Sequence, residues 1–211
     1  MKWQKAIAAI AATVVIGFSA QPASAAFSDV PKSEWYATPI EKLAKYDIIS
    51  GYEDGSFKPN KQVTRAQAAT IIANALRIDT KSVATPRYTD VSRANGHYGA
   101  IAALTKKGVF EDGQRFYPNR PLTRQQMAKI LVESFHLKSS GIVTFTDVSP
   151  KNWSYRYIGT LGALGITTTS GEFSPKVPIT RAQLAAFIER TIDHKRKDNE
   201  RDIWDTWKNW G

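Results

Sequence analysis

The sequence has 211 residues, with 29 Lys and Arg against 19 Asp and Glu, which gives a formal net charge of +10. Hydrophobic residues make up 42% of the chain and charged residues 23%, a composition that excludes a fully disordered or collagen-like protein. The absence of cysteine excludes disulfides, thiolate metal sites and cysteine nucleophiles. The basic excess predicts an anionic partner without identifying it.

The first 25 residues have the layout of an export signal. Lys2 and Lys5 precede an uncharged, mostly apolar run over 6–20, and a small-residue cleavage pattern ends at Ala25. The run is shorter than the roughly 20 residues that a transmembrane helix needs, so we favour a signal peptide over 1–25 rather than an uncleaved anchor. No second run of spanning length follows, and we predict an exported protein without a stable membrane span.

The remaining chain repeats one pattern three times. Each copy begins with an aromatic-x-Asp-Val segment, continues through Phe-x-Pro, and reaches a Thr-Arg-x-Gln segment followed by apolar residues at helical spacing. Because these motifs recur in order and in register, we predict repeats over 27–78, 88–137 and 145–192, with a tail over 193–211. The aspartates are Asp29, Asp90 and Asp147, and the arginines are Arg65, Arg124 and Arg181.

Each repeat is expected to form a helix, a loop and a second helix. Apolar residues recur on one face of both segments, and Gly108 and Gly165 suit a left-handed stop after the first helix in two of the copies. One such pair of helices is too small to bury both apolar faces, so we predict that three copies pack as a single all-α domain. Met127 and the Phe residues on the second stripe are assigned to its core.

The Thr-Arg-x-Gln segments have the pattern of a capping box, in which Thr accepts from the N3 amide and Gln binds the N-cap amide. The Arg falls in the first helical turn, where the helix dipole disfavours a cation. Its occurrence in all three copies indicates either an anion site made by helix amides and the guanidinium, or a structural ion pair with the Asp of a repeat. We favour the anion site.

Residues ahead of the first helix are further candidates. The aspartates either contact a ligand or cap a turn. Trp35 and Trp153 stand at one position of the first and third repeats, where they either stack on a sugar ring or pack in the core, and burial is the safer expectation. The second repeat has Gly96 at this position.

These three sets of motifs resemble the S-layer homology (SLH) family, which usually occurs as three copies after a signal peptide. The resemblance covers about 27–192 and implies a pseudo-threefold arrangement around a central helical bundle. It also implies non-covalent binding, in grooves between neighbouring motifs, to a secondary cell wall polymer on peptidoglycan that typically carries pyruvylated N-acetylmannosamine. It assigns ligand binding to Arg65, Arg124, Arg181, Asp29, Asp90, Asp147, Trp35 and Trp153.

The sequence departs from the family pattern in two ways. The family's Glu is replaced by Gln in each Thr-Arg-x-Gln segment, which still completes a capping box. Gly96 replaces a Trp in the second repeat, and the loops of the second and third repeats are shorter than that of the first. We therefore expect unequal grooves, with the one that depends on the second repeat's aromatic the most doubtful.

The tail over 193–211 has balanced charge and carries Trp204, Trp207 and Trp210 at a spacing close to one helical face. We expect either a helix docked on the domain or a frayed end, or else an anchor whose three Trp contact S-layer or other surface proteins or a membrane interface.

No catalytic motif, metal-ligand spacing or cofactor motif is recognisable, and the three His residues are scattered. The predicted function is non-enzymatic anchoring in the cell wall or S-layer, without metal or cofactor. Two alternatives stay open: a small wall-associated glycan hydrolase, and a general polyanion or nucleic-acid binder, against which the export signal and the lack of a Lys/Arg-rich run argue. Release of reducing sugar from purified wall and competition with DNA would distinguish them.

Overall fold

The computed structural model describes residues 27–199, so the predicted signal peptide and the three tail tryptophans lie outside the described residues. Over this range the chain forms helices and no β-sheet, which confirms the predicted all-α class with helix-loop-helix repeats. The helices are α1 (Ala37–Lys45), α2 (Arg65–Ala75), α3 (Tyr98–Lys106), α4 (Arg124–Ser134), α5 (Tyr155–Ala163) and α6 (Arg181–Asn199).

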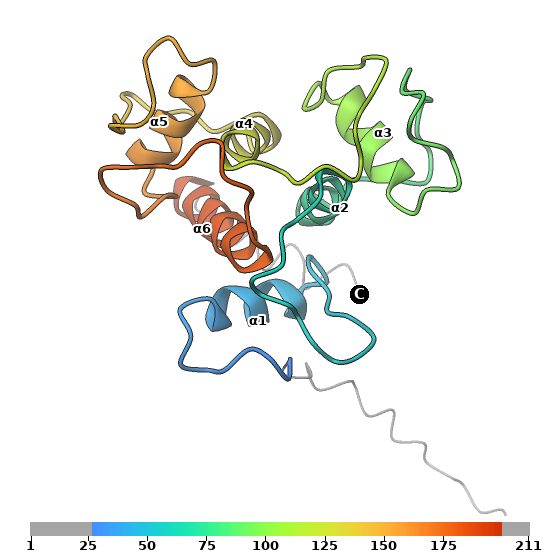
Figure 1. Ribbon diagram of the computed structural model, residues 1–211, viewed down its shortest axis with the longest axis horizontal. Helices are drawn as coiled ribbons and strands as arrows, with labels where there is room; N and C mark the ends of the chain where they lie inside the picture. The colour runs from blue at the N-terminus through green and yellow to red at the C-terminus, as the bar shows by residue number, and fades with distance from the viewer. Residues whose placement is uncertain (1–26, 200–211) are drawn as a thin grey trace, which may run out of the picture.

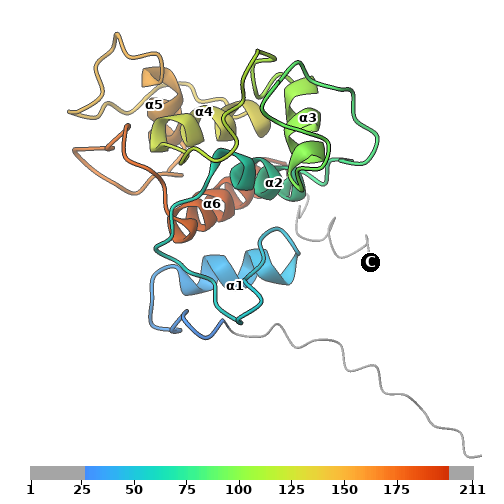
Figure 2. The same ribbon diagram turned by 45° about the vertical axis from the view of Figure 1, so that its right-hand side comes forward.

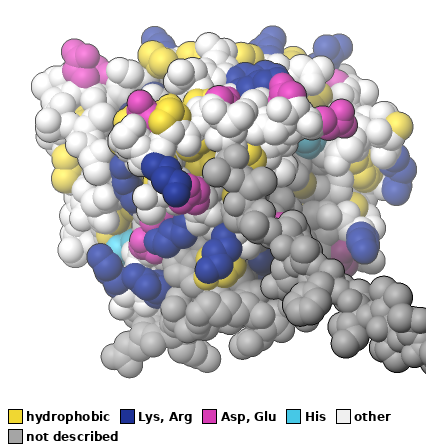
Figure 3. All heavy atoms as spheres, turned by 90° about the horizontal axis from the view of Figure 1, so that it is seen from below, with side chains coloured by type: hydrophobic (Ala, Val, Ile, Leu, Met, Phe, Trp, Pro, Cys, Tyr) yellow, Lys and Arg dark blue, Asp and Glu magenta, His cyan; other side chains and the backbone are white. Residues whose placement is uncertain are grey.

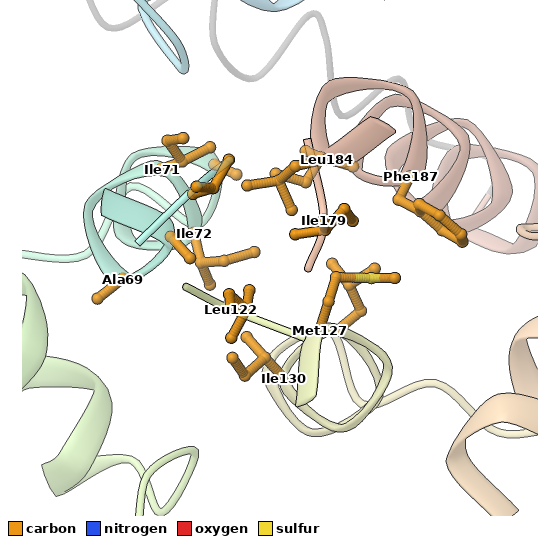
Figure 4. Close-up of a cluster of buried hydrophobic side chains, with 14 of the residues drawn as sticks. Ala69, Ile71, Ile72, Leu122, Met127, Ile130, Ile179, Leu184 and Phe187 are labelled. Carbon is orange, nitrogen blue, oxygen red and sulfur yellow. The ribbon is translucent and has the colours of Figure 1, made fainter. Parts of the chain in front are cut away.

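The second helix of each repeat lies at the centre of the domain. Figure 1 shows α2, α4 and α6 surrounded by α1, α3 and α5, and the outer helices stay at the periphery in the second view (Figure 2). Side chains from the inner segments meet on the axis, among them Ile72, Met127 and Leu184 (Figure 4), and each of these three is 1% exposed. The assignment of Met127 to the core is confirmed.

Each outer helix packs on the inner helix of a different repeat. α3 contacts α2, α5 contacts α4, and α1 contacts α6, so the first repeat closes a ring with the third. Lys42 of α1 strengthens this closure, because its Nζ lies 2.7 Å from Glu189 and 3.0 Å from Asp193 of α6. Because these helices pair between repeats rather than within one repeat, the core forms only when all three copies pack together.

A cyclic set of backbone hydrogen bonds joins the segments that precede the inner helices. The amide of Val63 donates to the carbonyl of Ile179 at 3.0 Å, the amide of Ile179 to Leu122 at 2.9 Å, and the amide of Leu122 to Val63 at 2.8 Å. These residues are almost fully buried, so the polar groups would be costly if they were unpaired. The ring fixes how the three inner helices begin relative to one another.

Local signals in the sequence agree with the helix ends. Gly108 and Gly165 adopt positive φ of 78° and 67° after the outer helices, as predicted, and Asp47 takes the same conformation at 55° in the first repeat. Capping boxes are present at Thr64 and Thr123. The same reciprocal bonds join Thr180 and Gln183 at the start of α6. The Thr and Gln side chains thus serve helix initiation in all three repeats.

Candidate functional site: interrepeat grooves

The aspartate of each repeat holds the Phe-x-Pro loop of the same repeat. In the first repeat, the Asp29 carboxylate accepts from the amides of Phe57 at 2.6 Å and Lys58 at 2.7 Å. The middle residue of each loop has positive φ although it is not glycine and precedes proline, a combination that costs free energy. These residues are Lys58, Tyr117 and Ser174, with φ of 58°, 60° and 59°. The paired hydrogen bonds to Asp stabilise this conformation.

The same arrangement recurs in the other repeats. Asp90 accepts from the amides of Phe116 and Tyr117, each at 2.8 Å. Asp147 accepts from Phe173 at 2.8 Å and Ser174 at 2.7 Å. Both oxygens of each carboxylate are therefore engaged by the loop. The structure supports the expectation that the aspartates cap a turn.

The Phe-x-Pro loop also caps an inner helix of another repeat. At α2, the amide of Arg65 donates to the carbonyl of Arg120 at 2.9 Å, and the amide of Ala66 donates to Pro118 at 3.0 Å. Equivalent bonds occupy the first two amides of α4 and α6, and the capping box occupies the third. The expectation that free helix amides help to bind an anion is wrong, because protein groups already accept from them.

Each arginine reaches from its helix to the Phe of the loop that caps it. The Nε atoms donate to the Phe carbonyls at 2.8 Å for Arg65 and Phe116, 2.7 Å for Arg124 and Phe173, and 2.7 Å for Arg181 and Phe57. Each guanidinium also lies over the ring of the same Phe, with Cζ 4.3 to 4.6 Å from the ring centroid. None of the three forms a salt bridge with Asp29, Asp90 or Asp147, so the alternative of a direct Arg–Asp ion pair is not found among these six described residues.

Burial lowers the pKa of all three arginines below its ordinary value. The opposite charges of Asp90, Asp147 and Asp29 partly offset this effect at Arg65, Arg124 and Arg181 respectively. A guanidinium keeps its proton in a protein, so each arginine stays cationic at neutral pH. Aspartate, loop and arginine thus form one unit, in which the Phe backbone connects the two charges.

The three arginines differ in the hydrogen bonds of their Nη groups. Nη2 of Arg181 donates to the carbonyl of Ser50 at 2.6 Å. The Nη groups of Arg65 and Arg124 make no hydrogen bond to any residue of the described part of the chain. They are therefore available to bind an oxyanion, and a guanidinium can do so with two parallel hydrogen bonds.

Arg65 and Arg124 each line a groove to which all three repeats contribute. The Arg65 groove has a volume of about 700 Å³, and its lining includes Arg65, Phe116, Tyr117, Gln126, Lys129 and Trp153. The Arg124 groove has a volume of about 200 Å³, and its lining includes Arg124, Thr168, Gln183, Phe187, Arg190 and Trp35. Each groove therefore contains one candidate arginine and one candidate tryptophan, which come from different repeats.

Trp35 and Trp153 are exposed, at 57% and 54%, and the expectation that they are buried is wrong. Neighbouring aromatic rings support them at the surface: Tyr36 lies edge-on to Trp35 at 5.2 Å, and Tyr157 lies edge-on to Trp153 at 6.3 Å. The outer helices bury smaller apolar residues instead, such as Ile40 and Leu43 of α1. An exposed indole in a groove offers a flat apolar face to a ligand.

The region around Arg181 is built differently. Gly96 stands where the other repeats place Trp, and it supplies no aromatic wall. The next residue, His97, contacts Thr70 of α2, with Nδ1 and Oγ1 2.8 Å apart. Together with the Arg181–Ser50 bond, these features agree with the predicted inequality of the grooves.

Several groove residues escaped the sequence interpretation. Tyr157, Lys129 and Arg190 lie in the grooves but belong to helix faces that look like ordinary solvated surface in the sequence. The alignment of the repeats offers a signal for two of them, because the positions of Lys129 and Arg190 change charge from copy to copy. No set of acidic and His side chains suited to a metal ion occurs over 27–199. Over the same residues, no helix has the length and apolar character to cross a bilayer.

The structure is a closed helical repeat domain whose interrepeat grooves combine arginine with exposed tryptophan. The chain belongs to the family of the S-layer homology domain, which matches residues 26–69, 87–128 and 144–185. It is 34% identical over 199 residues to an S-layer protein of Bacillus thuringiensis subsp. finitimus, covering 90% of this chain and 24% of that protein.

Other relatives differ in what surrounds the matched region. The Surface-layer 125 kDa protein of Lysinibacillus sphaericus is 34% identical over 92% of this chain, and an amylopullulanase of Thermoanaerobacterium thermosulfurigenes is 32% identical over 77% of it. The chain spans 17% and 9% of these two proteins. The family and the S-layer relatives indicate a secreted protein of the cell wall and surface, with an anchoring role there.

Proposed function

We propose that this chain anchors to the cell wall by binding an acidic secondary wall polysaccharide in the Arg65 and Arg124 grooves, without catalysis or cofactor. The observation that carries the proposal is the pairing, in both grooves, of unoccupied guanidinium Nη groups with an exposed tryptophan. A carboxylate, such as that of a pyruvyl ketal, binds the guanidinium, and a sugar ring stacks on the indole. The ligand is thus held by charge at one point and by apolar contact at another.

In this proposal the three arginines do not have the same role. Nε of each one holds the loop, while Nη of Arg65 and Arg124 meets the ligand. The aspartates act on the ligand only by holding the Phe-x-Pro loops, because both of their oxygens accept from loop amides. Trp35 and Trp153 complete the binding set.

Binding of mature protein to purified sacculi, before and after acid extraction of the wall polymer, tests the proposal. Strong binding that disappears on extraction is expected, and equal binding to both preparations contradicts it. Trp35→Ala and Trp153→Ala should each weaken binding, and together they should remove most of it, because each alters one groove. Both tryptophans are exposed, so neither change should unfold the protein.

A matched control is Ile142→Ala, since Ile142 is 42% exposed and is not part of the lining of either groove. This variant should bind sacculi as the unchanged protein does. On the face seen from below the view of Figure 1, the Lys and Arg side chains of the described residues are dispersed and several lie beside Asp or Glu (Figure 3). Because each proposed site pairs a guanidinium with an exposed indole rather than using a broad basic surface, DNA should compete poorly with wall polymer.

A further inference from the structure

The Arg65 and Arg124 grooves differ in charge at matched positions of the repeats. Before the Phe of the loop, the Arg65 groove has Arg115, where the corresponding residue of the third repeat is Glu172. Two residues after the loop Pro, it has Arg120 in place of Val177. On the inner helix, it has Lys129, where the Arg124 groove has Ala186. Three cations are thus present in one groove and absent from the same positions in the other.

The additional cations all line the Arg65 groove, and each has its own contacts there. The positive charge of Arg120 contributes, after burial, to the lowered pKa of Arg65. Arg120 is held over the ring of Tyr117, with its Cζ 4.2 Å from the ring centroid. Lys129 contacts Glu111, the acidic residue in the lining of the Arg65 groove, at 3.3 Å, but the Glu111 side chain is 91% exposed, and such a surface pair is weak. Arg115 lies within electrostatic reach of Asp90, whose oxygens are engaged by the loop.

The Arg124 groove has less room and less charge. Its volume is about 200 Å³ against about 700 Å³ for the Arg65 groove. The cations in its lining are Arg124 and Arg190, and Arg190 also donates from Nη1 to the carbonyl of Ile166 at 3.4 Å. The rest of its polar lining comes from neutral side chains such as Thr168 and Gln183.

We propose that the two grooves recognise different parts of the wall polymer. The Arg65 groove binds a segment that carries two negative groups, one held by Arg65 and the second by Arg115, Arg120 and Lys129. The Arg124 groove binds a segment that carries one. The inference rests on the proposed function and adds a ligand preference to it: the second group is a carboxylate or a phosphate on a neighbouring sugar, both of which guanidinium groups bind.

The test uses three disaccharide glycosides as probes in calorimetric titrations. One carries a single ketal carboxylate, one carries two, and one carries a carboxylate and a phosphate. Trp35→Ala leaves the Arg65 groove as the main site, and Trp153→Ala leaves the Arg124 groove. We expect at least one doubly charged probe to bind the Arg65 groove about tenfold more tightly than the single one, which corresponds to a few exposed ion pairs. The Arg124 groove should show no such preference.

A residue exchange tests whether the named cations are the cause. A triple variant, made in the Trp35→Ala background, gives the Arg65 groove the residues that the third repeat has at these positions. Its changes are Arg115→Glu, Arg120→Val and Lys129→Ala. This triple change should remove the preference for the second charge and retain binding of the single-charge probe. The matched control, Lys106→Glu with Lys107→Ala and Lys138→Ala, makes the same change in net charge at exposed positions outside both linings. It should retain the preference.

The outcomes separate this inference from the proposed function. Binding of all probes with equal affinity in both grooves overturns the inference and leaves the proposed function standing. Loss of the preference in the control triple also overturns it, because the effect would then come from overall charge. Failure of every probe to bind either groove contradicts the proposed function itself. Whichever doubly charged probe gains affinity identifies the second group as a carboxylate or a phosphate.

Discussion

The Arg65 groove and the region around Arg181 share one scaffold but differ in the groups that surround the arginine side chain. In both, an inner-helix arginine donates from Nε to a Phe carbonyl and lies over the Phe ring. In the Arg65 groove, Nη remains available and Trp153 is exposed nearby. Around Arg181, Nη2 donates to Ser50, and the position of the tryptophan holds Gly96. The comparison shows that the structural bond explains why an arginine is repeated, whereas the proposed binding requires available Nη atoms and a neighbouring indole.

Replacing the arginines should give the largest effect and separate the two roles. Arg181→Ala leaves the carbonyls of Phe57 and Ser50 without a donor, so we expect the free energy of unfolding to fall by about 3 kcal/mol. Arg65→Ala leaves one such carbonyl and should cost about 1–2 kcal/mol while it weakens wall binding strongly. Urea unfolding followed by circular dichroism measures both. Equal losses of stability would contradict the assigned difference.

The loop that supports the Arg65 groove should depend on the charge of Asp90. Burial alone would raise the pKa of Asp90, but hydrogen bonds from the amides of Phe116 and Tyr117 lower it overall. Since the folded pKa lies below the ordinary value of 3.8, the carboxylate stabilises the fold above that pH and loses this effect as the pH falls through the folded pKa. Asp90→Asn should cost about 1–2 kcal/mol at pH 7.

Measuring the unfolding free energy of this variant and of the unchanged protein from pH 7 down to about pH 3 checks the sign. The difference should shrink as the pH falls below about 4, because the unchanged protein then also loses its carboxylate. A difference that stays constant over this range would show that Asn disturbs the loop sterically rather than electrostatically.

Repetition made most of the fold predictable from the sequence. Three copies of one amphipathic pattern indicated the all-α domain, and the Thr and Gln of each capping box behave as predicted. Sequence could not reveal that α1 packs on α6, because helix pairing between repeats depends on how the long loops cross. It also misjudged the tryptophans, because the preference of Trp for burial is an average that a supporting Tyr at the surface overrides.

The same limit applies to the site. The sequence placed Arg65, Arg124 and the two tryptophans among the candidate ligand-binding residues, and they line the two grooves, but it assigned the anion-binding role partly to helix amides. Those amides already donate to loop carbonyls and Thr oxygens, so they are not free to donate to a ligand. Spacing along one chain cannot report that a loop from another repeat caps a helix. Nor can spacing show that Arg65 and Arg124 bond to the protein through Nε alone, whereas Arg181 also bonds through Nη2.

A smaller effect should come from His97, which follows Gly96 and contacts Thr70 of α2. Burial lowers its pKa below the ordinary value of 6.5, so the folded protein favours neutral histidine. The contribution of His97 to the free energy of unfolding is therefore fully present above about pH 6.5, and it declines as the pH falls from there toward the folded pKa. His97→Gln keeps a polar partner for Thr70 but does not titrate. As the pH is lowered from 7.5 to 5, the free energy of unfolding of this variant, relative to that of the unchanged protein, should rise by less than about 1 kcal/mol. A fall over this range would contradict the expected sign.

The smallest expected effect tests the comparison most directly. Gly96→Trp restores the aromatic that the second repeat lacks, and a side chain at Gly96 meets open space, so stability should change by less than about 0.5 kcal/mol. Titration with the single-carboxylate disaccharide should still give two binding events, because Nη2 of Arg181 remains bonded to Ser50. A third event of similar affinity would show that tryptophan alone makes a groove functional. Two events would show that the aromatic surface and the available guanidinium are separate requirements, both of which the Arg65 and Arg124 grooves meet.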